Sequence, residues 1–299
     1  TPMYLPEAPF VKYAERFKQH LDVPIIASGS IHSIEMCENV VRTGMADLVA
    51  MARPLFADPE LPTKIFEGNE DAIIPCIRCN TCVAREQGGA RGHCAVNPIA
   101  GRETEQLEKS ADPKTILVVG AGPAGIQLAL SARNRGHTVL LVEKEKHIGG
   151  QIALAETFSF KKSFTRLLGY YSKALASAGV EVYLNSEITE TLAKFGDCID
   201  LVVFTTGNQI PVPDRFIVSP IIASSVLEGL SHLETLGSKV AIIGANLVGV
   251  EAAWHLAKYG CEVSLVERSN RLADDVNLIN RIVFPDVLSE AGVSVLMET

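Results

Sequence analysis

One pattern occurs twice in this chain, 124 residues apart, and it constrains the fold more than any other feature. Residues 116–125 and 240–249 each join an apolar run to a glycine-rich turn. A second apolar run follows in both copies, over 138–143 and 262–267, and ends in glutamate. A strand, a glycine turn, a helix and a second strand that ends in an acidic residue form the dinucleotide-binding βαβ unit. This self-similarity predicts an α/β protein with two Rossmann-like domains.

The first copy carries the complete G-x-G-x-x-G motif. Gly120 permits the tight turn, Gly122 lets the backbone approach a pyrophosphate, and Gly125 lets the helix pack on the strand. The helix N-terminus offers unpaired N–H groups to the phosphates. Glu143 can accept hydrogen bonds from ribose hydroxyls. We therefore predict an adenine dinucleotide here, and a glycine-rich βα turn without a ligand is the alternative.

The second copy departs from the motif at one position. It keeps Gly244, Gly249 and the acidic Glu267, but Asn246 replaces the middle glycine. Asparagine tolerates a positive φ better than most residues, yet its side chain crowds the path of a pyrophosphate. The glutamate favours an unphosphorylated ribose and hence NADH. Two arginines close behind it leave NADPH as the alternative.

A cysteine motif precedes the repeat, with the spacing C-x2-C-x2-C-x11-C. Four thiolates are what a cubane iron–sulfur cluster needs, one for each iron. Zinc also takes four thiolates, but its usual pattern is two separated C-x2-C pairs. The spacing therefore favours a [4Fe–4S] cluster, with zinc or no metal as alternatives. The four candidate ligands are Cys76, Cys79, Cys82 and Cys94.

The first 70 residues predict a further α/β segment. Their short apolar strands suit a parallel sheet. The expected elements are a helix over 9–21, a strand over 23–27, a helix over 33–44, a strand over 47–51 and a helix over 62–68. Ser33 can cap the second helix, and its predicted apolar stripe is Ile34, Cys37 and Val41. Residues 101–113 are charged and polar and are expected to form a linker.

Composition limits the classes of partner. The net charge of −8 argues against nucleic acid, and no apolar run reaches the roughly 18 residues of a membrane span. Three further cysteines, Cys37, Cys198 and Cys261, stand singly and are expected in the core. Free thiols beside a cluster predict a reducing cytoplasm. The chain begins without methionine and ends in an apolar strand, so we expect a piece of a longer polypeptide.

Together these motifs resemble the flavin- and iron–sulfur-containing branch of the old yellow enzymes, to which 2,4-dienoyl-CoA reductase, 2-enoate reductase and trimethylamine dehydrogenase belong. The resemblance covers nearly the whole chain. It implies four parts: the C-terminal piece of a TIM barrel with the FMN phosphate site (1–70), an iron–sulfur segment and linker (71–112), an FAD-binding domain (113–212) and an inserted, truncated NAD(P)-binding domain (213–299).

The resemblance also implies which residues bind the cofactors. Residues 25–31 and 51–59 resemble the seventh and eighth barrel strands with their loops, which often build a phosphate site. The implied FMN phosphate contacts are Gly29, Ser30, Ala52 and Arg53. The Arg53 guanidinium would pair with the charge of the FMN phosphate. Its alternative role is an ion pair at the rim of the barrel. The four cysteines match the cluster ligands, and the implied FAD positions are Gly120, Gly122, Gly125, Glu143 and Gln151.

The implied activity is an electron relay. Electrons would pass from NADH through FAD and the cluster to FMN, which would reduce an activated C=C bond of an enoate or dienoyl-CoA. The alternative is an amine dehydrogenase that sends electrons from FMN through the cluster to a carrier protein. A flavoprotein with a redox-regulatory role represents another class. No catalytic acid is assigned, since the earlier barrel strands supply it in this family, and the motifs define no oligomeric state.

Overall fold

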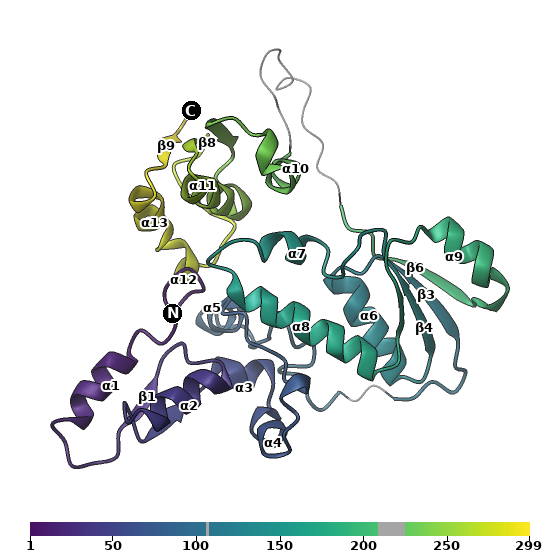
Figure 1. Cartoon of the computed structure of the whole chain (residues 1–299), viewed down its shortest axis with the longest axis horizontal. Coiled ribbons are helices and arrows are strands. Elements are labelled where there is room, and N and C mark those ends of the chain that lie inside the picture. Colours follow the sequence, from purple (N-terminus) through teal and green to yellow (C-terminus); the bar gives the residue numbers. More distant parts are fainter. Residues whose placement is uncertain (106–107, 209–224) are drawn as a thin grey trace. The chain divides into compact units, whose positions relative to one another are not determined.

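The structure, a computed structural model, describes residues 1–105, 108–208 and 225–299. The chain divides into two compact units, Thr1–Gly207 and Asn208–Thr299 (Figure 1). The predicted domain boundary between residues 212 and 213 lies outside the described residues. None of the helices in the described ranges has the length and apolar character needed to cross a membrane.

The first unit begins with the predicted alternation of short strands and helices. Strands β1 (Ile26–Ser28) and β2 (Leu48–Ala50) pair in parallel, with Ile26 opposite Leu48. The helices around them are α1 (Val11–Lys18), α2 (Ile34–Arg42), α3 (Arg53–Ala57) and α4 (Leu61–Phe66). The Ser33 hydroxyl accepts a hydrogen bond from the Met36 N–H at 3.3 Å, so the predicted cap of α2 is present.

Two details of the sequence prediction were wrong here. Helix α2 buries Val40, which is 3% exposed, whereas Val41 is 47% exposed. The helix is rotated from the predicted stripe because Val40 joins the small core formed with Ala27 and Ile31. Cys198 is exposed rather than buried, since it ends the short 3-10 turn η2 (Gly196–Cys198).

The cysteine segment forms more regular structure than expected. A 3-10 turn, η1 (Glu70–Ala72), precedes it, and helix α5 (Thr81–Gln87) begins inside the motif. Asn80, the residue before α5, has a φ of 59° in the left-handed region. This conformation turns the chain between the second and third cysteines.

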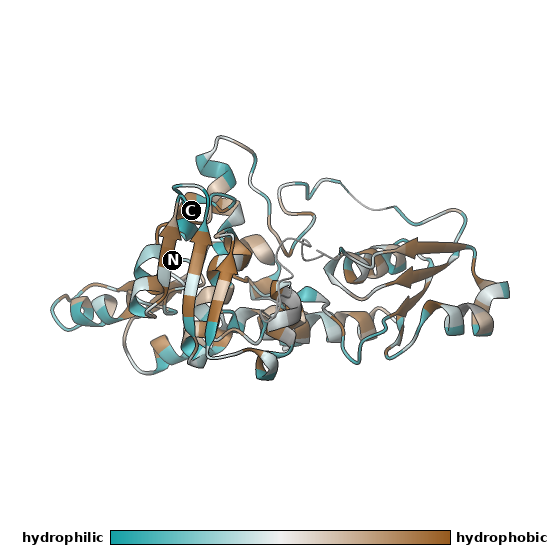
Figure 2. Cartoon of the chain, turned by 90° about the horizontal axis from the view of Figure 1, so that it is seen from above, coloured by the Kyte–Doolittle hydropathy of each residue, from teal (hydrophilic) through white to brown (hydrophobic). Residues whose placement is uncertain are grey.

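A four-stranded parallel sheet follows, with strand order β5-β4-β3-β6. Its strands are β3 (Thr115–Val119), β4 (Thr138–Val142), β5 (Glu181–Tyr183) and β6 (Leu201–Phe204). The helices between them are α6 (Pro123–Asn134), α7 (Gln151–Ala155), α8 (Lys162–Ser177) and α9 (Ile188–Phe195). The order reverses between β3 and β6, which is the point where doubly wound sheets bind ligands. Figure 2 shows the apolar character of the strands of this chain in brown.

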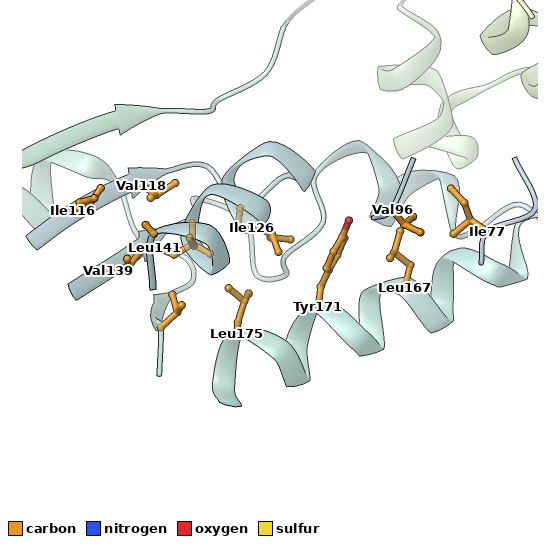
Figure 3. Close-up of a cluster of buried hydrophobic side chains, with 14 of the residues drawn as sticks. Ile77, Val96, Ile116, Val118, Ile126, Val139, Leu141, Leu167, Tyr171 and Leu175 are labelled. Carbon is orange, nitrogen blue, oxygen red and sulfur yellow. The ribbon is translucent and has the colours of Figure 1, made fainter. Parts of the chain in front are cut away.

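One helix joins the core of this sheet to the cysteine segment. Leu167, Tyr171 and Leu175 recur every four residues and are buried along α8. Figure 3 shows Leu175 toward the strands of the sheet and Leu167 beside Ile77 and Val96. The cysteine segment and the Rossmann-like sheet therefore share one hydrophobic core.

The second unit repeats the same construction with a three-stranded parallel sheet of order β7-β8-β9. Its strands are β7 (Lys239–Ile243), β8 (Glu262–Glu267) and β9 (Ser294–Met297). Its helices are α10 (Val226–Ser231), α11 (Leu247–Tyr259), α12 (Leu278–Arg281) and α13 (Phe284–Glu290), with the 3-10 turn η4 (Leu233–Thr235). Helix α11 follows the glycine turn and is buried along most of its length.

Candidate cofactor sites

The three glycines of the first turn are required for different reasons. Gly120 has a φ of +102°, and a Cβ there would lie 2.7 Å from the Thr205 carbonyl oxygen. A Cβ on Gly125 would lie 1.9 Å from the Gly120 oxygen, so the fold itself excludes a side chain. A Cβ on Gly122 would meet no protein atom within 4 Å. The open space beside Gly122 is where the motif places the pyrophosphate.

Glu143 is buried at the end of β4 and holds the turn. Its Oε2 accepts a hydrogen bond from the Ala121 N–H at 2.7 Å, and its Oε1 accepts one from the Glu145 N–H at 3.0 Å. An ionised carboxylate offers about four acceptor positions. The carboxylate therefore keeps acceptor capacity for ribose hydroxyls while it fixes the loop.

A second glycine loop lies against the turn and brings Gln151 to it. The Gly149 N–H donates to the Ala121 carbonyl at 2.7 Å, and a Cβ on Gly150 would lie 3.2 Å from the Gly122 Cα. Gln151 follows as the first residue of α7 and is exposed. All five predicted FAD positions are thus gathered at the carboxyl ends of β3 and β4.

Thr205, the residue directly after β6, was not among the residues predicted to bind a cofactor. Its hydroxyl lies 3.0 Å from the Val119 carbonyl and 2.8 Å from the Gly120 carbonyl, to which it donates. The threonine thereby fixes β6 against the turn at the topological switch point. The Thr-Thr-Gly sequence after an apolar strand was the available signal.

The second turn has the same backbone geometry. Gly244 has a φ of +98°, and a Cβ on Gly249 would lie 1.9 Å from the Gly244 oxygen. Glu267 accepts hydrogen bonds from the Ala245 and Ser269 N–H groups, each at 2.8 Å. These bonds lower the pKa of Glu267 and keep it ionised. The donors Ala245 and Ser269 lie 124 positions after Ala121 and Glu145, which donate to Glu143 in the first unit.

The N-terminus of α11 differs from that of α6, because side chains occupy it. Asn246 Oδ1 accepts a hydrogen bond from the Gly249 N–H at 3.0 Å. Asp275 Oδ1 accepts one from the Leu247 N–H, also at 3.0 Å. The Asn246 side chain, which was expected to crowd the pyrophosphate path, therefore caps α11. The Asp275 carboxylate binds a second N–H group of the same helix turn.

A cavity of about 340 Å³ lies at the ends of β1 and β2. Among the residues that line it are all four predicted FMN phosphate contacts, Gly29, Ser30, Ala52 and Arg53. Gly29 and Ser30 both have positive φ, +101° and +57°, so the loop bends sharply there. Cys76 lines the same cavity, which places the first cluster cysteine beside the phosphate residues.

Arg53 contacts both the phosphate loop and the cysteine segment. Its Nη2 donates to the Ser30 hydroxyl and its Nη1 to the Thr1 carbonyl, each at 3.1 Å, and Nη1 also donates to the Asn80 side-chain oxygen. These partners are uncharged oxygens. The guanidinium charge is available to a phosphate in this cavity, which disfavours a rim ion pair.

The four motif cysteines gather within electrostatic range of one another. After burial, the neighbouring Cys79 and Cys94 contribute to a raised pKa of the Cys76 thiol, and Cys79 and Cys82 contribute to a raised pKa of the Cys94 thiol. Burial raises the pKa of the Cys76 thiol to about 11, and it also raises the pKa values of Cys82 and Cys94. Buried thiols of this kind ionise when a metal replaces their protons. The donor set fits a thiolate-bound metal cofactor.

Arg78, between the first two cysteines, supplies a compensating charge. Its Nη2 donates to the Pro2 and Leu5 carbonyls at 2.7 and 2.8 Å, and its own N–H donates to Cys76 Sγ at 3.5 Å. Its buried Nε has no hydrogen-bond partner among the described residues. Its Nη1 also lies 3.7 Å from the Glu7 carboxylate, so the guanidinium charge is shared between that ion pair and the neighbouring Cys76 sulfur.

Zinc and a cubane cluster place different demands on four thiolates. One zinc ion needs all its thiolates about 2.3 Å from one point, whereas a cubane takes one thiolate on each of four irons. Across residues 1–105, 108–208 and 225–299, no group of three or more His, Cys, Asp or Glu side chains is placed to hold a metal ion. The preference for the cluster therefore rests on the spacing of the cysteines in the sequence.

Two Rossmann-like units with glycine turns, preceded by a parallel strand pair that borders a cavity, define the architecture of the chain. Residues 114–299, more than half of the chain, match the family model described as pyridine nucleotide-disulphide oxidoreductase, so the chain belongs to that family. Residues 6–72 match the NADH:flavin oxidoreductase / NADH oxidase family. The resemblance and the fold class predicted from the sequence are confirmed.

Individual relatives agree with this assignment. The chain is 38% identical to the cinnamate reductase of Clostridium sporogenes, over 90% of this chain and 40% of that protein. It is 36% identical to an NADH oxidase of Thermoanaerobacter brockii, over 95% and 45%. A solved structure of 2-naphthoyl-CoA reductase superposes with a TM-score of 0.91 at 28% identity, over 99% of this chain and 46% of the other. The chain spans less than half the length of each.

The two family matches indicate which cofactors belong to proteins of this kind. The two matched families imply FAD, a nicotinamide dinucleotide and FMN, and homologues carry [4Fe–4S] clusters. The predicted cofactors are confirmed at this level. Which residue contacts which cofactor, and where the four domains meet, stay predictions.

Proposed function

We propose that this chain works in an oxidoreductase that takes electrons from NADH and reduces an activated C=C bond. The bound groups would supply two-electron chemistry at FAD and FMN and one-electron transfer at the [4Fe–4S] cluster. The observation that carries the proposal is the position of the cysteine segment. Cys76 lines the FMN phosphate cavity, and the same segment packs on α8 of the FAD-binding sheet.

The residues of the chain have separate roles in this proposal. Arg53 offsets the phosphate charge of FMN, and Arg78 offsets the charge of the thiolate-bound cluster. Glu143 orients the ribose of FAD, while Gly122 leaves room for its pyrophosphate. The proposed cluster ligands are Cys76, Cys79, Cys82 and Cys94.

The proposed substrate is a small molecule whose C=C bond is conjugated to a carboxylate or thioester. The names of two relatives, cinnamate reductase and 2-naphthoyl-CoA reductase, support this class. Nucleic acid is not proposed as a partner because the net charge is −8, and neither is a membrane. Reduced thiols beside the cluster support placement in the cytoplasm.

The second candidate is oxidation of an amine, with electrons leaving through the cluster to a carrier protein. The observation that favours it is the capped N-terminus of α11, since that reaction does not need a nicotinamide dinucleotide. The matched NADH oxidase and cinnamate reductase favour the first candidate.

Anaerobic spectroscopy tests the choice. NADH added to the complete oxidoreductase that contains this chain, loaded with its cofactors, should bleach the flavin absorbance, and cinnamate should then restore it. A Gly122→Val variant, which blocks the FAD site, should not respond to NADH. Bleaching by trimethylamine or dimethylamine and not by NADH would reject the first candidate.

A further inference from the structure

We infer that Asp275 and Asn246 set the affinity of the second unit for its dinucleotide, because their side chains occupy the N–H groups that a pyrophosphate would use. The inference rests on the proposed binding of a nicotinamide dinucleotide by this unit. It adds Asp275, which lies outside both the glycine motif and the acidic strand end, and it gives a specific role to Asn246, which replaces the middle glycine of the motif.

The competition follows from the hydrogen bonds of α11. A pyrophosphate binds at a helix N-terminus through the N–H groups of the first turn. Here the first N–H, from Leu247, donates to the Asp275 carboxylate, and the third, from Gly249, donates to the Asn246 amide oxygen. A dinucleotide that binds at this turn must displace both acceptors.

The first unit provides an internal comparison. Gly122 stands 124 positions before Asn246 and has no side chain, although the two residues have nearly the same backbone angles. Pro123, the first residue of α6, has no N–H to satisfy. Gln151 stands 124 positions before Asp275 and is uncharged. The first turn therefore lacks both competing groups.

The alignment of the two loops is supported by their hydrogen bonds. The Gly149 N–H donates to the Ala121 carbonyl at 2.7 Å, and the Ala273 N–H donates to the Ala245 carbonyl at 2.6 Å. Ala273 even adopts the positive φ of its glycine counterpart, at 48°. Asp275 and Gln151 thus lie at the same place relative to their turns.

Charge strengthens the competition. A pyrophosphate carries negative charge, and the carboxylate of Asp275 is exposed at the same helix terminus. Repulsion between two unit charges about 5 Å apart in water weakens binding about fourfold, and a doubly charged pyrophosphate raises this to more than about tenfold. A dinucleotide therefore loses affinity both through displacement and through repulsion.

The experiment is a titration of the full chain, loaded with its cofactors, with NADH at low ionic strength. The variants Asp275→Gln and Asn246→Gly install the residues of the first unit, singly and together. We expect Asp275→Gln to lower the dissociation constant about tenfold, and the double variant to lower it further. The gain from Asp275→Gln should shrink at 0.5 M salt, because salt screens the repulsion.

The matched control is Asp274→Asn, which removes the same charge one residue away. The Asp274 carboxylate pairs with Arg281 at 2.6 Å and Arg271 at 3.5 Å instead of α11. Its variant should leave the dissociation constant within about twofold, since its charge is already paired. FAD content should stay unchanged in all variants, which reports that the first unit is intact.

The outcomes separate this inference from the proposed function. Equal NADH affinity in the wild type and the double variant would overturn the inference and leave NADH as the donor. Binding by the double variant alone would support the inference and count against the NADH-driven reaction. An absence of binding in every variant would overturn both.

Discussion

At the scale of the residue, Gly122 is the glycine of the first turn that a ligand would require and the protein fold does not. The neighbouring Gly120 and Gly125 are fixed by close protein atoms, whereas a side chain on Gly122 meets open space. Substitution there should obstruct the pyrophosphate without straining the protein. Gly122 can therefore test FAD binding without the ambiguity of a misfolded variant.

We predict that Gly122→Val abolishes retention of FAD and leaves the unfolding of the apoprotein unchanged. The isopropyl group would fill the space of the pyrophosphate. Flavin extracted from purified protein measures the first effect, and circular dichroism during heating measures the second. Gly169→Ala is the control, since a Cβ on Gly169 in α8 also meets no atom within 4 Å. Full FAD content in Gly122→Val would show that the site is assigned wrongly.

The sequence predicted the individual glycines and glutamates because their roles depend on neighbours within one βαβ unit. It did not predict the contacts of Thr205 with Gly120 or of Asp275 with Leu247. These partners lie 85 and 28 residues apart, so only the folded chain brings them together. Long-range contacts of this kind have no local sequence pattern.

At the scale of the element, α8 connects two sites. Its Leu167 is 1% exposed and packs beside Ile77 and Val96, whereas Leu175 packs toward the strands of the sheet. Helix α8 was not predicted from the sequence, and which of its ends meets the cysteine segment follows only from the tertiary structure. The short helices α3 and α5, of five and seven residues, also escaped prediction.

We predict that Leu167→Ala and Leu175→Ala each lower the free energy of unfolding by about 2–5 kcal/mol, because both leave cavities in a packed core. Only Leu167→Ala should speed the loss of the cluster in air, because only that side chain supports the cysteine segment. Denaturant unfolding measures the stability, and decay of the visible absorbance of the cluster measures its loss. Equal decay in both variants would contradict this role of α8.

The cysteine segment gives a separate prediction. Anaerobically purified protein should hold about four irons and four sulfides for each chain. Cys82→Ser should reduce that content while FAD, bound on the neighbouring sheet, is retained. Elemental analysis and flavin extraction on the same samples provide both numbers. Stoichiometric zinc without iron would reject the cluster.

At the scale of the whole molecule, the sheets that carry the two proposed flavin sites differ in size. The FAD turn lies on a four-stranded sheet with helices and a buried core, whereas the FMN cavity lies on two paired strands. Ile26 and Leu48 in those strands are 58% and 54% exposed. The family resemblance implied only a piece of a barrel over residues 1–70, whereas the exposure of its strands is known only from the structure.

We therefore predict that residues 1–299 expressed alone retain FAD and hold FMN far below stoichiometry. A flavin bound at the mouth of a barrel depends on strands around the whole ring, and open strand edges favour association between chains. Chromatography of the extracted flavins separates FMN from FAD, and size-exclusion chromatography reports association. A monomer that holds one FMN for each chain would contradict the prediction.

The internal repeat has a practical consequence for experiments on this protein. Ala121 and Ala245, Glu143 and Glu267, and Gly149 and Ala273 make equivalent hydrogen bonds at the same offset of 124 positions. A substitution in one unit thus has a structural counterpart in the other, within the same polypeptide and at the same concentration. Differences in nucleotide affinity between such paired variants report the chemistry of the site alone, because expression, oligomeric state and buffer are shared.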